Sequence, residues 1–210
     1  MTYPDFKDSI TTVAQLREVL GSPSAMVEAK VIQALDVHCR EFIAKSPFLL
    51  VASADGVGKV DVSPKGDPAG FVQVLDEHTI AIPERLGNRL ADTLLNILQR
   101  PQVGLLFVIP GRRETLRAGG TAKIVRDDWL LERMVVAGKK PALATVVTLD
   151  RVFFHCAKCV IRSSLWKPEG WPDINGMATL AQAVKDHAKL KDSVDTLQQV
   201  LDVSYRDRLY

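Results

Sequence analysis

The sequence FLLVASADGVGKVDV occupies residues 48–62 and places an apolar run on each side of Asp55-Gly56. Asp-Gly between two apolar runs is one of the stronger short-range signals for a β-hairpin. We therefore expect two antiparallel strands here, over Phe48–Ala52 and Val57–Val62. The hairpin also marks the point where the spacing of apolar residues changes from that of helices to that of strands.

The strand pattern continues to residue 155. We expect further strands over residues 71–75, 79–82, 103–109, 115–125 and 144–155. Turns are expected at Asp76-Glu77 and Pro110-Gly111. Gly119-Gly120 lies inside a strand pattern, which indicates a bulge or a close approach of two backbones. Strands joined by such short turns favour antiparallel pairing, and closure into a small barrel would remove exposed sheet edges.

Helical patterns stand before, within and after the strands. Residues 10–45 read as two helices separated by Gly21-Ser22-Pro23-Ser24. A helix is expected from Asn88 to about Gln99 and another from Asp127 to about Val136. The tail from residue 177 is again helical. The sequence thus predicts an α+β fold, a β-barrel with helices around it, in one domain over residues 1–210.

Composition limits the class of protein. The 210 residues carry a formal net charge of +2, which is too small to favour nucleic acid or an anionic membrane as a partner. No apolar stretch approaches the ~20 residues that a membrane span needs, and the first ten residues, MTYPDFKDSI, contain no apolar signal core. Three cysteines, an odd number, favour a reducing compartment. We expect a cytoplasmic protein.

A group of cations follows the hairpin. Ser63-Pro64-Lys65-Gly66-Asp67 precedes Ile82-Pro83-Glu84-Arg85-Leu86-Gly87-Asn88-Arg89 by about twenty residues. Lys65, Arg85 and Arg89 are expected at strand ends, before a helix that begins near Gly87. Each alone is typical of a solvated surface. Three cations at a helix N-terminus, however, make a site for a small dianion such as a phosphate monoester.

Four motifs in series carry a family resemblance. They are Val62-Ser63-Pro64-Lys65-Gly66-Asp67, Ile82-Pro83 with Gly87-Asn88-Arg89, Thr115-Leu116-Arg117 with Gly120, and His155-Cys156-Ala157-Lys158 with Arg162-Ser163 and Leu165-Trp166. Over residues 40–175 the chain resembles the flavoproteins related to pyridoxamine 5'-phosphate oxidase. The resemblance implies a mostly antiparallel split β-barrel of six to seven strands. Its parts would be N-terminal helices over 1–45, the barrel over 46–166 and C-terminal helices over 177–205.

The resemblance also implies a cofactor and an assembly. It predicts an FMN-dependent oxidoreductase acting on a small molecule, built as a homodimer with two flavins at the subunit interface. Lys65 and Arg89 would hold the FMN phosphate, and the segment that ends at Arg89 would run along the flavin. The partner chain would contribute His155, Arg162 and Trp166. The full expected cofactor site comprises Ser63, Pro64, Lys65, Gly66, Ile82, Pro83, Glu84, Arg85, Asn88, Arg89, Arg117, His155, Arg162 and Trp166. No catalytic residue is assigned and no metal is expected.

The end of the chain departs from the family. Pyridoxine 5'-phosphate oxidases end in a segment with a Trp, an Arg and a terminal Leu-x-Pro, and they carry an Arg-x-His pair. Residues 203–210, VSYRDRLY, have no such pattern, so oxidation of vitamin B6 is not expected. Two other functions stay open: a non-catalytic flavin-binding protein for storage or sensing, and a deazaflavin-dependent reductase on the same fold.

Two features near the end of the barrel have two interpretations each. Cys156 and Cys159 are spaced to chelate a metal or to form a disulfide, or they are small residues at the end of a strand near a flavin pocket. Trp166 and Trp171 stand among prolines and glycines, either as an apolar cover for the flavin or in ordinary packing.

Overall fold

The structure, a computed structural model, describes residues 5–210. By its internal contacts the chain divides into two units, one up to Val31 and one from Ile32 to Tyr210. The first unit contains α1 (Val13–Leu20) and α2 (Ala25–Ala29). The side chain of Thr12 caps α1 in a capping box with Gln15. Neither helix has a buried residue.

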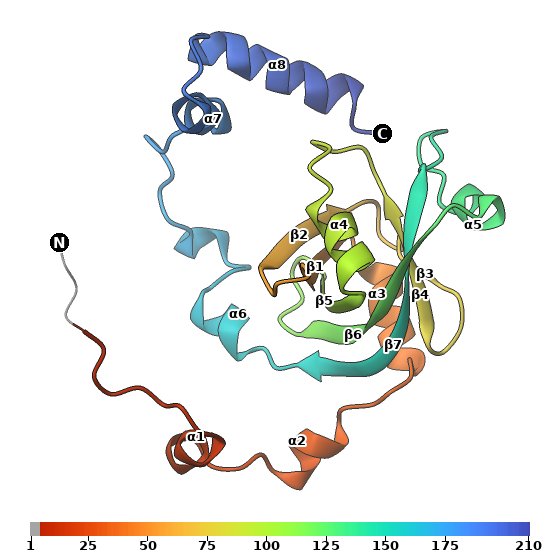
Figure 1. Cartoon of the computed structure of the whole chain (residues 1–210), viewed down its shortest axis with the longest axis vertical. Helices are drawn as coiled ribbons and strands as arrows, with labels where there is room; N and C mark the ends of the chain where they lie inside the picture. The colour runs from red at the N-terminus through yellow and green to blue at the C-terminus, as the bar shows by residue number, and fades with distance from the viewer. Residues whose placement is uncertain (1–4) are drawn as a thin grey trace. The chain divides into compact units, whose positions relative to one another are not determined.

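The second unit holds the sheet and the remaining helices (Figure 1). Its elements in chain order are α3 (Val37–Lys45), β1 (Phe48–Ala54), β2 (Val60–Gly66), β3 (Gln73–Val74), β4 (Thr79–Glu84), α4 (Asp92–Gln99), β5 (Gln102–Val108), β6 (Thr115–Val125), α5 (Asp128–Glu132), β7 (Leu143–His155), α6 (Lys158–Arg162), the short 3-10 helix η1 (Pro168–Gly170), α7 (Leu180–Ala188) and α8 (Val194–Asp207).

Seven strands form one sheet in the order β2-β1-β5-β6-β7-β4-β3. Every pair of neighbours is antiparallel, as the short turns predicted. The α+β class and the seven-stranded antiparallel sheet of the predicted split barrel are therefore confirmed. The strands at the two ends of the sheet, β2 and β3, do not pair with each other.

The predicted hairpin is present, but its turn is longer than Asp-Gly alone. Asp55 Oδ1 accepts hydrogen bonds from the backbone N–H groups of Val57 at 3.0 Å and Lys59 at 2.8 Å. Gly58 adopts a φ of +92°, which other residues rarely do. β2 consequently begins at Val60 rather than Val57 and continues to Gly66. The segment with Lys65 thus belongs to the strand.

Gly120 confirms the close approach predicted for the glycine pair. The register between β6 and β7 shifts between Gly119 and Gly120, so that Asp150 is the extra residue of a bulge. A Cβ atom on Gly120 would lie 2.0 Å from the carbonyl oxygen of Thr148. At Gly119 the nearest atom would be 3.6 Å away, an ordinary contact.

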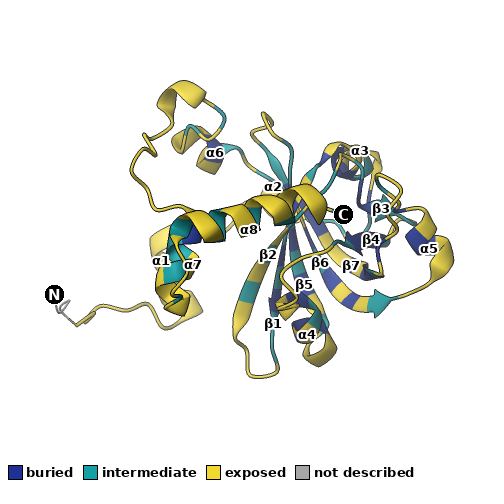
Figure 2. Cartoon of the chain, turned by 90° about the horizontal axis from the view of Figure 1, so that it is seen from above, coloured by how far each residue is buried: buried dark blue, intermediate teal, exposed yellow. Residues whose placement is uncertain are grey.

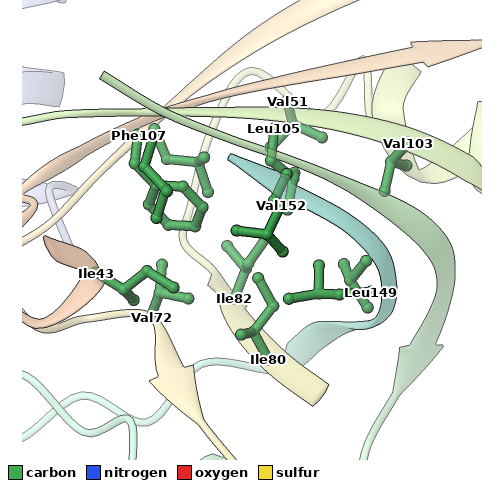
Figure 3. Close-up of a cluster of buried hydrophobic side chains, with 14 of the residues drawn as sticks. Ile43, Val51, Val72, Ile80, Ile82, Val103, Leu105, Phe107, Leu149 and Val152 are labelled. Carbon is green, nitrogen blue, oxygen red and sulfur yellow. The ribbon is translucent and has the colours of Figure 1, made fainter. Parts of the chain in front are cut away.

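Two apolar clusters flank the sheet. The main core collects inward side chains from β1, β5, β6 and β7 and from α3, including Ile43, Phe107 and Val152 (Figure 3). A second cluster joins Ala81 of β4 to Leu130 and Leu131 of α5. Both faces of β4 are therefore covered, and the strand is buried along most of its length (Figure 2).

Three predicted helices differ from the observed ones. The second N-terminal helix is interrupted between α2 and α3, because Ile32 forms a two-way backbone bridge with Val152 of β7. The helix expected from Asn88 begins only at Asp92. The helix expected to reach Val136 ends at Glu132, because Val136 pairs with Lys139. None of the helices in residues 5–210 has the length and hydrophobicity of a membrane span.

Candidate functional site

Two ion pairs connect β2 to the end of β4. Lys65 Nζ lies 2.6 Å from Glu84 Oε2, and Arg85 Nε lies 2.6 Å from Asp67 Oδ2. β2 and β4 are not hydrogen-bonded neighbours in the sheet. The sheet must therefore curl to bring them together, and the two pairs bridge the open side of the split barrel. We call this place the seam, defined by Lys65, Asp67, Glu84 and Arg85.

Glu84 is held from both sides. Its Oε1 accepts a hydrogen bond of 2.9 Å from the hydroxyl of Thr145, which is buried on β7. Its Oε2 accepts a hydrogen bond from the ammonium group of Lys65, and the Glu84 side chain is only 10% exposed. Screening by water is reduced at such a position, so the attraction to Lys65 is stronger than that of a surface pair. The carboxylate fixes where the Lys65 ammonium group lies.

Arg85 is fixed in the same manner. Besides its bond to Asp67, it donates from Nη2 to the carbonyl oxygen of Met134 at 2.7 Å. Two of its five N–H groups are used in these bonds, which leaves others for a ligand. The Asp67 side chain is 1% exposed, and its second oxygen, Oδ1, has no hydrogen-bond partner among the described residues.

A cavity of about 970 Å³ opens beside the seam. Its walls come from four segments of the second unit and from Phe71; the segments are residues 61–67 of β2 and its end, residues 83–94, residues 139–143, and Leu209 with Tyr210. This volume lies at the upper end of the usual range for cofactor and ligand sites. Cations and carboxylates both line it, together with the apolar side chains of Leu86, Leu90 and Leu143.

Arg89 lies in the loop between β4 and α4. It lines the cavity and is exposed, and no ion pair or hydrogen bond to its side chain occurs within residues 5–210. Its φ of 65° and the φ of 57° at Ala91 lie in the left-handed region, where non-glycine residues are uncommon. Such strain in a loop is often associated with a functional site. Arg89 is thus a cation of the cavity that the seam does not neutralise.

The first turn of α4 also faces the cavity, through residues 91–94. Ala91 occupies the N-cap position, and no side chain caps the helix there. The backbone N–H groups of the first turn are therefore available to an anion. Asp92 in the same turn contributes a negative charge, which partly offsets the positive end of the helix dipole.

Most of the sequence-predicted site residues meet in this cavity. Those that line it are Ser63, Pro64, Lys65, Gly66, Pro83, Glu84, Arg85, Asn88 and Arg89. Ile82 does not, because it is buried in the main core. Arg117 lies on β6 with its guanidinium 5.1 Å from the ring of Phe153, outside the cavity.

The three residues expected from a partner chain are outside this chain's cavity. His155 ends β7, and Arg162 is exposed in α6. Trp166 donates from its indole nitrogen to the carbonyl oxygen of Arg112 at 2.7 Å. Trp171 makes a similar bond of 3.0 Å to Leu165. None of the four lines the cavity. Their role at a flavin stays a prediction.

Sequence reasoning missed three polar residues of the site: Asp67, Thr145 and Tyr210. Asp67 ends the motif Ser63-Pro64-Lys65-Gly66-Asp67, and a carboxylate two residues after Lys65 was a signal that a cation of the site has a partner. Thr145 lies in an apolar run, and nothing in the sequence connects it with Glu84, 61 residues earlier. Tyr210 reaches the cavity from the far end of the chain. Only the folded arrangement joins these positions.

The cysteines form no metal site with their neighbours. Cys39 is buried, whereas Cys156 and Cys159 are exposed, and all three are free thiols. No group of three or more His, Cys, Asp or Glu side chains within residues 5–210 is arranged to hold a metal ion. Burial, followed by the neighbouring Asp36, raises the pKa of Cys39 to about 12. That thiol is protonated at neutral pH and contributes to packing.

Comparison with known proteins places the chain in a family. A family model described as "Pyridoxamine 5'-phosphate oxidase" matches residues 35–156, more than half of the chain. The protein belongs to this family. The matched region includes all seven strands of the sheet and both sides of the seam. No curated protein matches the chain.

Solved structures give more distant likenesses. HupZ from Group A Streptococcus is 20% identical, with 57% of this chain and 93% of that chain covered and a TM-score of 0.47. HutZ, a heme storage protein from Vibrio cholerae, is 17% identical, with 58% and 93% covered and a TM-score of 0.39. An FMN-binding protein from Syntrophomonas wolfei is 8% identical, with 69% and 97% covered and a TM-score of 0.42. At these identities and TM-scores, the similarities say nothing about the ligand of this chain.

Proposed function

We propose that the cavity binds FMN with its phosphate at Arg89, and that the protein is an FMN-dependent oxidoreductase acting on a small molecule. Membership of the pyridoxamine 5'-phosphate oxidase family supports this class of cofactor. The observation that carries the proposal is Arg89, a cavity cation that residues 5–210 provide with no ion-pair partner. A phosphate monoester is nearly a dianion, and a guanidinium can bond two of its oxygens at once.

The seam supports the same ligand because it supplies hydrogen-bond donors to the cavity, although it adds little net positive charge. Lys65 and Arg85 are each matched by a carboxylate, so neither adds much field at the cavity. An ammonium group has three N–H donors, and the Lys65 bond to Glu84 uses one of them. The remaining donors of Lys65 and Arg85 have fixed positions, which lowers the entropy cost of binding a phosphate or ribityl oxygen.

FMN, when bound, would supply the redox chemistry by accepting or donating a hydride or single electrons. The chain's own contribution would be position and shelter. Pro83 is buried near the end of β4, and its ring restricts φ and so keeps a fixed backbone conformation beside the cavity. Leu86 and Leu90 are exposed apolar side chains of the cavity wall, suited to an isoalloxazine ring.

The direct test is to identify what the purified protein holds. We expect a yellow protein that releases FMN on denaturation, identified by mass spectrometry of the released ligand. Release of a deazaflavin would instead support the alternative reductase on the same fold. A colourless protein that also fails to bind added FMN would rule the proposal out.

Turnover separates an enzyme from a storage or sensing protein. If the protein is an oxidoreductase, the photoreduced flavin should be reoxidised by a small-molecule acceptor. A flavin-loaded protein that is inert toward NADH, NADPH, oxygen and B6 vitamers would favour a non-catalytic binding role.

We also propose a homodimer with the flavin at its interface. His155, Arg162 and Trp166 lie outside this chain's own cavity, so a role at the flavin requires a second copy. The ring of a flavin needs apolar walls on both faces, and the barrel interior is filled by the main core. A two-fold dimer would place two equivalent sites between the chains. Light scattering should give twice the chain mass; a stable monomer loaded with FMN would contradict this.

Complementation between subunits tests the shared site. Arg89→Ala and Arg162→Ala should each weaken FMN binding when assembled alone. When the two variant homodimers are dissociated and mixed, some heterodimers should form. In each heterodimer one flavin site has both arginines and the other site has neither. Tight FMN binding would then reappear in the mixture. If the mixture binds no better than its components, Arg162 does not act on the flavin of the partner chain.

A further inference from the structure

Tyr210 lies against the seam from the far end of the chain. The guanidinium carbon of Arg85 is 5.6 Å from the centre of the Tyr210 ring, within the range of a cation–π contact. Arg85 itself is immobilised by Asp67 and by the carbonyl oxygen of Met134. Both Arg85 and Tyr210 line the cavity. The ring therefore rests on a fixed cation at the cavity wall.

The other end of the tyrosine side chain faces a carboxylate. Burial, and then interaction with Asp67, raises the pKa of the Tyr210 phenol, while the nearby Arg85 lowers it to a smaller extent. The phenol therefore keeps its proton and remains a hydrogen-bond donor at neutral pH. No hydrogen bond reaches Asp67 Oδ1, although the Asp67 side chain is 1% exposed.

A buried carboxylate oxygen without a donor is costly, and a neighbouring donor removes that cost with little movement. Tyr210 is a neutral hydrogen-bond donor of the cavity wall that lies beside Asp67. Because Asp67 is also tied to Arg85, a bond from Tyr210 would join the end of the chain to both sides of the seam. The end of the chain would then lie across one side of the cavity.

We propose that Tyr210 is a latch of the cofactor site: its hydroxyl donates to Asp67 Oδ1 and its ring covers Arg85, so that residues 209–210 close the cavity over a bound flavin phosphate. The flavin part of this inference rests on the proposed function; the contact of Tyr210 with Asp67 does not. With the latch closed, water reaches Arg85 less easily, and a ligand leaves only after the latch opens.

The first experiment measures ligand release. FMN dissociation is followed by stopped-flow fluorescence in the wild type, Tyr210→Phe, Tyr210→Ala and Tyr205→Phe. Tyr205 lies on α8, is 56% exposed and is outside the cavity, so it is a matched control. Loss of a hydrogen bond to a charged group should make Tyr210→Phe release FMN roughly tenfold faster. Tyr210→Ala should be faster still and Tyr205→Phe unchanged. Wild-type release rates in both Tyr210 variants would overturn the latch.

The second experiment needs no flavin. Hydrogen exchange of the amides in residues 204–210 should be several-fold faster in Tyr210→Phe than in the wild type. Asp67→Ala, which removes the acceptor together with the ion pair to Arg85, should also speed exchange, and adding Tyr210→Phe to it should cause no further increase, because the contact is already lost. Independent, additive effects would overturn the contact. If the protein binds no FMN, the proposed function fails, and this exchange measurement still decides whether the latch contact exists.

Discussion

The carboxylate of Asp36 determines where α3 begins. Its Oδ1 accepts a hydrogen bond of 2.8 Å from the backbone N–H of Cys39, one of the first-turn groups that have no partner within the helix. This bond lowers the pKa of Asp36 below its ordinary value of 3.8. The helix in turn positions Cys39, Phe42 and Ile43 in the main core. A single cap therefore anchors one helix to the barrel.

Replacing this cap should weaken the fold by a measurable amount. We expect Asp36→Ala to lower the free energy of unfolding by about 1 kcal/mol, the usual cost of losing an N-cap, in urea denaturation at neutral pH. Because the folded-state pKa is lowered, the stabilisation is complete well above 3.8 and disappears as the pH falls through the folded-state pKa. Equal unfolding free energies for the variant and the wild type at neutral pH would contradict this role.

At the residue scale, the sequence predicted which cations lie close together. It did not predict which of them form ion pairs with carboxylates. Lys65, Arg85 and Arg89 do line one cavity. The sequence predicted that three cations converge, and the structure pairs two of them with Glu84 and Asp67. Each pair joins residues 18 or 19 positions apart across strands that are not neighbours. Only the curl of the sheet brings them into contact, so local patterns could not reveal the pairing.

Among the elements, the bulge of β7 opposite Gly120 of β6 makes the sharpest demand on a single residue. Gly120 faces the backbone of β7 so closely that a Cβ atom would lie 2.0 Å from Thr148 O and 2.9 Å from the Cα of Leu149. Backbone atoms of a central strand cannot move aside without disturbing the ladder. β6 and β7 form the longest pairing of the sheet, and the bulge bends both strands around the core.

Two neighbouring glycines provide a matched test. We expect Gly120→Ala to lower the free energy of unfolding by about 2 kcal/mol or more, in the range of an overpacked site. Gly119→Ala, with its nearest contact at 3.6 Å, should change stability by less than about 1 kcal/mol. Thermal or chemical unfolding of the two variants decides this. Similar losses for both would mean that the close approach at Gly120 is not the cause.

Strands were predicted better than helices, for a physical reason. Strand patterns such as residues 103–109 and 115–125 alternate toward one buried face, so burial enforces what the sequence suggests. Helix ends depend on competing tertiary contacts. Residues 88–91 contain no strong helix breaker, yet Arg89 and Ala91 take left-handed conformations and delay α4 to Asp92. In the same way, the bridge from Ile32 to Val152 overrides the helical spacing before α3.

At the scale of the whole molecule, fold and site share the same feature. An antiparallel sheet whose end strands do not pair leaves a seam, and the ion pairs across it also form one wall of the cavity. The family, the sheet and the group of cavity residues could be predicted from sequence, because strand signals and four motifs determine them. Thr145 and Tyr210 could not, because their contacts join distant segments. Asp67 stands in one of the motifs, but its pairing with Arg85 across the curled sheet could not be predicted.

The central claim is that Arg89 holds the phosphate of FMN, and titration of FMN and riboflavin into the same variants tests it most directly. Arg113 is exposed and outside the cavity, so Arg113→Ala is the matched control. By isothermal titration calorimetry, Arg89→Ala should weaken FMN binding by about 1.5–3 kcal/mol, the range for a hydrogen bond to a charged group. Riboflavin, which lacks the phosphate, should bind equally to wild type and Arg89→Ala. Equal losses for both ligands, or no loss for FMN, would contradict the account.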